Sequence, residues 1–95
     1  MNNGWMEVKI FSLKNGYEYY DKVKAIRIKS KEYNLLIMKD YMPLIGKIEG
    51  ELDIEREENS VHFSHIIGFY MLTNDSFELI LKGDANETNF KRRCQ

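Results

Sequence analysis

The sequence predicts an all-β domain, specifically a two-sheet β-sandwich of about eight to ten short strands. Three observations support this class. Apolar and polar residues alternate along most of the chain, which is the pattern of half-buried strands. Turn-forming residues recur every ~8–12 residues, as in sandwiches and barrels. No segment of about ten residues or more shows the period of an amphipathic helix.

The first third of the chain predicts a hairpin followed by a long, irregular strand. Residues alternate between apolar and charged over Met6–Ile10. Asn15-Gly16 follows, and both residues tolerate the positive φ of a tight hairpin turn. Within Tyr17–Lys29 the alternation changes phase, which one extra residue in a strand would cause. We therefore expect a β-bulge near Lys24–Ala25.

The remaining strands are read from short apolar runs separated by polar turns. Gly46 and Gly50 fall inside the clearest of these strands, and glycine in a strand often marks a bend or the close approach of another segment. We expect the domain to cover residues 1–83 and residues 84–95 to be a flexible polar tail. The expected strands of this part are 35–38, 44–55, 61–65, 66–72 and 77–81.

The charge balance and the cysteine content limit the classes of function and partner that we expect. The 95 residues include 14 basic and 15 acidic side chains, so the net charge is -1. This balance supplies no field to gather nucleic acid or an anionic membrane. The aromatic and lysine group within Tyr17–Lys24 could stack bases, but we expect no nucleic-acid partner. A single cysteine, no secretory pattern and no membrane-length apolar run predict a cytoplasmic protein without membrane insertion.

No catalytic or metal-binding motif is found. The glycines are scattered singly, so no phosphate-binding loop is expected. His62 and His65 are three residues apart, which on a regular strand places them on opposite faces. The acidic residues within 53–58 lack the spacing of a calcium loop. We expect no catalytic residue, no metal and no cofactor, and hence a domain that acts by contact.

One family resemblance adds to this reading. The stretch Asn34–Ile45 reads Asn-Leu-Leu-Ile-Met-Lys-Asp-Tyr-Met-Pro-Leu-Ile. It is similar to Glu-Leu-Gly-Ile-Leu-Pro-Gly-His-Ala-Pro-Leu-Leu in the epsilon subunit of F-type ATP synthases. Residues 23–28 resemble that family's Val-x-x-Val-x-Leu segment. Residues 63–72 resemble its Phe-Ala-Val-Ser-Gly-Gly-Phe-Leu-Glu-Val segment. The likeness to the family's N-terminal β-sandwich domain covers residues 6–82.

The resemblance implies a non-catalytic central-stalk subunit, peripheral on the inner face of the cell membrane. Such a subunit contacts the gamma subunit and the c-ring, and couples proton-driven rotation of the ring to the catalytic head. The family's ring-facing loop corresponds to 39–43, which gives Asp40, Tyr41, Met42 and Pro43 as the expected partner-binding residues. The family's Pro-Gly-His turn is replaced here by Lys39-Asp40-Tyr41.

The family's C-terminal helical hairpin has no counterpart in this sequence, so its regulatory roles are not transferred. These departures leave an alternative, a stand-alone β-sandwich interaction module that has diverged from the epsilon subunit.

Overall fold

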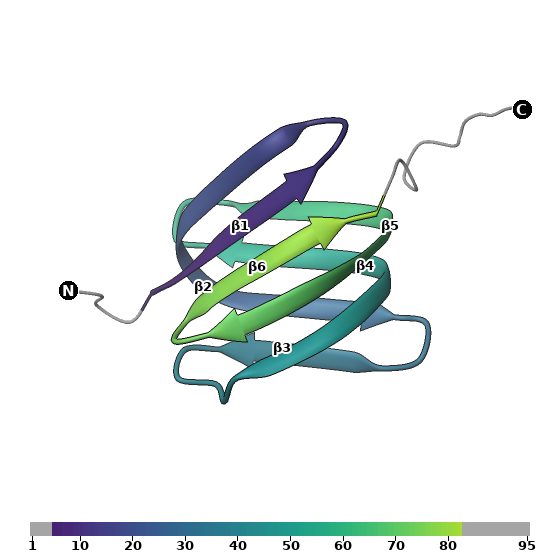
Figure 1. Ribbon diagram of the computed structural model, residues 1–95. Coiled ribbons are helices and arrows are strands. Elements are labelled where there is room, and N and C mark those ends of the chain that lie inside the picture. The colour runs from purple at the N-terminus through teal and green to yellow at the C-terminus, as the bar shows by residue number, and fades with distance from the viewer. Residues whose placement is uncertain (1–4, 83–95) are drawn as a thin grey trace, which may run out of the picture.

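The computed structural model describes residues 5–82, which form six strands and no helix (Figure 1). The all-β class predicted from the sequence is confirmed. No helix in this part of the chain could cross a membrane. The expected tail at 84–95 lies outside the described residues. The strands are β1 (Met6–Ser12), β2 (Gly16–Ser30), β3 (Asn34–Met38), β4 (Leu44–Arg56), β5 (Ser60–Thr73) and β6 (Ser76–Leu81).

Five of the strands close into a barrel. The sheet order is β1-β6-β5-β4-β2-β3, and β1 also pairs with β2. The β1–β6 pairing is parallel and the others are antiparallel. The ring β1-β6-β5-β4-β2 therefore has no free end, and β3 lies outside it on β2. Closure of this kind removes most of the exposed strand edges.

The expected sandwich of eight to ten short strands is not confirmed. The described residues form six strands, and three of these are long strands that bend across the molecule. β2, β4 and β5 contain 15, 13 and 14 residues, and Figure 1 shows them curling from one side of the molecule to the other. One boundary that the sequence reading placed between two strands is a bend within a single strand. The expected strands 61–65 and 66–72 are both parts of β5.

β-Bulges produce these bends. In β2 the register against β4 shifts between Val23 and Ala25, as the change of phase in the sequence predicted. Between β4 and β5, Gly50 pairs with Ile66 and Leu52 pairs with Phe63. Two residues of β5, Ser64 and His65, thus oppose one residue of β4. His65 has a φ of 58°, and such a bulge bends the strand and increases its twist.

The core lies inside the barrel and is made almost entirely of aliphatic side chains. No polar or charged residue among those described is buried. Gly46 leaves room for the hydroxyl end of Tyr70, whose ring stacks on Phe77 with centroids 5.2 Å apart. The fully buried large side chains are Phe77, Met6, Ile10, Ile26, Ile28, Ile37, Ile48, Leu52, Ile54, Ile66, Leu72 and Leu79.

The tight turns follow the residues that the sequence supplies. β1 and β2 join in the expected hairpin, where Ser12 pairs with Gly16 and Gly16 has a φ of 74°. β5 and β6 join through Asn74 and Asp75, whose φ values are 48° and 65°. Asn and Asp tolerate this left-handed region better than other non-glycine residues.

Candidate partner-binding site

The predicted contact loop connects β3 to β4 and presents three of its four residues to solvent. Asp40 and Pro43 are exposed, and 67% of Met42 is exposed. Tyr41 is half-buried and packs against the core instead. The loop therefore has an apolar tip at Met42–Pro43 that is held on one side by a tyrosine anchor.

Hydrogen bonds to the next turn fix the shape of this loop. Asp40 has a φ of 68°, and its N–H donates to Oδ1 of Asp75 in the β5–β6 turn at 2.7 Å. Nζ of Lys39 lies 3.2 Å from Oδ1 of Asp40 and 3.4 Å from Oδ2 of Asp75. The hydrogen bond to Asp40, followed by the charge of both carboxylates, raises the pKa of Lys39. The loop and the β5–β6 turn thus form one preformed end of the barrel.

A second candidate surface lies on the outside of four adjacent strands. Phe69 on β5 pairs with Ile80 on β6, Ile80 pairs with Phe11 on β1, and Phe11 pairs with Tyr17 on β2. Paired residues point to the same side of a sheet, so these four side chains form one row across the strands. Met71 and Ile45 pair with each other in the adjacent row. We call Phe11, Tyr17, Ile45, Phe69, Met71 and Ile80 the outer apolar face.

The side chains of the outer apolar face are unusually exposed. The exposed fractions are 77% for Ile45, 60% for Ile80 and 56% for Phe69. The rings of Phe11 and Tyr17 are 5.0 Å apart, so the row is continuous at its β1–β2 end. A contiguous exposed apolar area of this kind is typical of interaction surfaces.

Sequence reasoning missed this face, although a signal was present. Residues of both parities are apolar in Ile66–Leu72 and in Leu79–Leu81. Strands with one wet side alternate, whereas strands covered on both sides read as continuous apolar runs. The continuous runs therefore indicated that the outer side of these strands would be covered.

The loop lies beside one edge of the outer apolar face, the edge formed by Ile45 and Met71, whereas Phe11 and Tyr17 lie at the β1–β2 hairpin. Ile45 belongs to the face and follows Pro43 by two residues, and Leu44 pairs with Leu72 beside the β5–β6 turn. Figure 1 places the β3–β4 loop and the β5–β6 turn next to each other at the lower left. One partner surface could therefore contact both.

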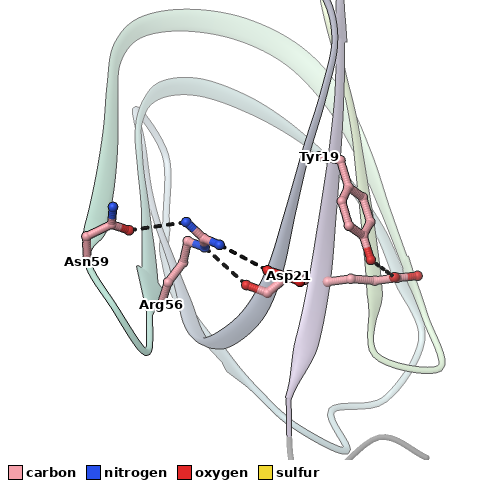
Figure 2. Close-up of polar contacts among 5 residues, drawn as sticks. Tyr19, Asp21, Arg56 and Asn59 are labelled. Atoms are coloured by element: carbon pink, nitrogen blue, oxygen red, sulfur yellow. Dashed lines mark hydrogen bonds and ion pairs between the residues drawn. The ribbon is translucent and has the colours of Figure 1, made fainter.

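Farther from the β1–β2 hairpin, the outer side of β1 and β2 is polar, as is the neighbouring β4–β5 turn. Figure 2 shows Arg56 between Asp21 and Asn59; Nη2 of Arg56 lies 3.0 Å from Oδ1 of Asp21. Arg56 also lies over the ring of Tyr20, 5.7 Å from its centroid. The hydroxyl of Tyr19 donates to Oε1 of Glu7 at 2.7 Å, and this bond raises the pKa of Tyr19 to about 12.

The tyrosine group of β2 is therefore divided rather than gathered on one face. Tyr17 and Tyr19 are exposed, and Tyr20 packs against the core beneath Arg56. Only two of the three rings are open to a base or any other flat partner.

The two histidines do not form a site within residues 5–82. Nδ1 of His62 is hydrogen-bonded to Asp53 directly across the β4–β5 ladder. The bulge at Ser64–His65 changes the phase of β5, so both histidines are exposed and the expected placement on opposite faces is wrong. No group of three potential metal ligands is found in the described part of the chain.

Comparison with known proteins supports the fold. One similar chain comes from the cryo-EM structure of the Tetrahymena thermophila mitochondrial ATP synthase central stalk and c-ring. The TM-score is 0.66 at 20% sequence identity, over 80% of this chain and 62% of that one. The protein thus spans about three-fifths of that chain's length. No family model and no curated protein sequence matches.

Proposed function

We propose that the protein is a non-catalytic, epsilon-like central-stalk subunit of an F-type ATP synthase. In this role it couples proton-driven rotation of the c-ring to the catalytic head through contact with the gamma subunit. The observation that carries the proposal is the shared fold with a chain of an ATP synthase central stalk and c-ring structure. The resemblance of residues 6–82 to the epsilon subunit points the same way.

The shape of the molecule suits transmission of torque. A closed barrel filled by close-packed aliphatic side chains deforms little under shear. Its contact groups then move with the scaffold, because they project from strands and from a loop that Asp75 ties down. No chemical step is required of the chain itself.

Each candidate surface has a place in this proposal. The outer apolar face packs against the gamma subunit, because burying Phe69 and Ile80 supplies the apolar area that a stable contact needs. The loop tip, with Asp40, Met42 and Pro43 exposed and Tyr41 behind them, faces the c-ring. The protein then lies peripherally on the inner face of the membrane.

Binding to the gamma subunit tests the proposal. We expect the full chain to co-purify with the gamma subunit of the same organism. Ile80→Lys should weaken that binding about tenfold or more, because a charge would be placed in the centre of a desolvated contact. Glu55→Gln is the matched control, since it changes the charge equally at an exposed position on β4 outside the face. A folded wild-type chain that does not bind the gamma subunit would contradict the proposal.

The alternative is a stand-alone interaction module diverged from the epsilon subunit. The replacement of the family's Pro-Gly-His turn by Lys39-Asp40-Tyr41 favours it. Under this alternative, the outer apolar face binds a partner outside the ATP synthase. The gamma-binding experiment separates the two functions, because only the central-stalk role requires that subunit.

A further inference from the structure

β3 offers an open strand edge. It pairs with β2 and with no other strand among residues 5–82. The N–H of Ser30 donates to the carbonyl of Tyr33 at 2.8 Å, which identifies the hydrogen-bonded pairs of the β2–β3 ladder as every second pair, including Ile28–Leu35. Asn34 and Leu36 therefore direct their backbone N–H and C=O groups away from β2, towards the free edge. Met38 directs its N–H there as well, while its carbonyl accepts from the N–H of Tyr41 at 3.2 Å.

Apart from its short length of five residues, this edge lacks the features that normally block strand pairing. Proteins protect edges with charges, proline or bulges, and β3 reads Asn-Leu-Leu-Ile-Met with a regular register against β2. Its outward side chains are apolar as well, since 43% of Leu36 and 54% of Met38 is exposed. On the neighbouring strand the corresponding outward residue opposite Leu36 is the charged Arg27.

We propose that β3 pairs antiparallel with β3 of a second copy of this chain, about a two-fold axis at Leu36. This register places Leu36 opposite Leu36 of the second copy and Asn34 opposite its Met38, so inward residues stay inward. It joins the backbone groups that β3 directs outward, and it buries the exposed apolar side chains of both copies together. A two-fold contact of this kind uses the same patch on both partners.

The charges near the axis permit this arrangement. β3 itself carries no charge, so no like charges face each other within the ladder. Beyond it, Tyr33 faces Lys39 of the second copy. Asp40 would approach Glu32 of the second copy, but its carboxylate is already paired with Lys39 at 3.2 Å.

The size of the contact predicts a weak dimer. Five paired residues per chain bury less than the roughly 1,200 Å² of a stable interface. We expect a dissociation constant on the order of 100 µM. The pairing is independent of the proposed ATP synthase role, since it uses neither the outer apolar face nor a second kind of subunit.

Sedimentation velocity of the full chain, from about 10 µM to about 1 mM, tests the proposal. Wild type should shift from monomer to dimer over this range. Leu36→Lys should remain monomeric, because the axis would bring two lysines together. An equimolar mixture of Leu36→Lys and Leu36→Glu should recover the dimer. Ile80→Lys, at an exposed position of the outer apolar face, should dimerise like wild type.

Several results would overturn the inference. These are a wild type that stays monomeric throughout, a Leu36→Lys variant that still dimerises, and a charge-complementary mixture that does not. Loss of the dimer in Ile80→Lys would instead assign self-association to the outer apolar face. Circular dichroism and the melting temperature of each variant verify that it is folded, since Leu36 is exposed and should tolerate the changes.

Discussion

The hydroxyl groups of Tyr33 and Tyr70 connect the β2–β3 turn to β4 and β5 where the ladder between β2 and β4 has ended. The hydroxyl of Tyr33 donates to the carbonyl of Lys47 at 2.5 Å and lies 2.8 Å from the hydroxyl of Tyr70. The pair borders a hollow of about 400 Å³ that is lined mainly by residues of the β2–β3 turn and of β4. Burial, followed by the hydrogen bond to Tyr33, raises the pKa of Tyr70.

This raised pKa makes stability depend on pH in the alkaline range. An unfolded tyrosine ionises near pH 10, so the stabilising effect of the Tyr70 hydroxyl is complete below about pH 10 and is lost as the pH rises through the folded value. Tyr70→Phe should cost about 1 kcal/mol at pH 7. Urea unfolding of both proteins from pH 7 to 11 should show this difference shrinking above about pH 10.

The phenylalanine variant is also the control, because it keeps the ring that stacks on Phe77 and retains every other titrating group. If the unfolding free energies of the two proteins changed with pH in parallel, the pKa of Tyr70 would be the same in the folded and unfolded states, which would contradict the prediction.

For individual residues, the sequence predicted the exposed tip of the β3–β4 loop at Met42–Pro43 but not the half-buried position of Tyr41. The motif around Pro43 and the polar residues beside it identified an exposed connection, and Met42 is exposed as that required. The inward orientation of Tyr41 was not predictable, because residues in a loop follow neither the strand nor the helix period. The bond from Asp40 to Asp75 spans 35 positions of sequence, and no local pattern reports such a contact.

At the scale of the elements, Gly50 allows β4 to approach β2 closely. Gly50 has a φ of 157°, and a Cβ at this position would meet the carbonyl oxygen of Lys29 on β2. Gly16 has a φ of 74° but no neighbour that a Cβ would meet. The two positions therefore separate the cost of backbone conformation from the cost of steric conflict.

We expect Gly50→Ala to destabilise the protein by about 3 kcal/mol or to prevent folding, because backbone of β2 would have to move. Gly16→Ala should cost only about 1 kcal/mol, the conformational part alone. Chemical denaturation measures both. Equal costs would contradict the close approach of β2 to Gly50.

The bends also explain why the strands were miscounted. The phase change in β2 was visible because apolar residues flank it on both sides, and the bulge was predicted there. In β5 the change from the alternating residues 61–65 to the apolar run 66–72 was read as the boundary between two strands. Whether a chain turns back or only bends at such a point depends on its pairing with a distant partner, here β4, which sequence pattern alone does not contain.

At the scale of the whole molecule, closure of the barrel is what creates the outer apolar face. The parallel β1–β6 pairing joins strands from the two ends of the sequence and brings Phe11 beside Ile80. Non-local pairing of this kind has no local signature, so the sequence predicted an all-β domain but neither its closure nor the row of exposed side chains that closure creates. The proposed role depends on that row being covered by the gamma subunit.

Methyl NMR spectra of the full chain, recorded as the gamma subunit is added, test this claim most directly. We predict that the signals of Ile45, Met71 and Ile80 shift or broaden until saturation, while that of Ile37, which is fully buried in the core, stays in place. Unchanged spectra, or changes confined to Leu36 and Met38 on β3, would contradict the account.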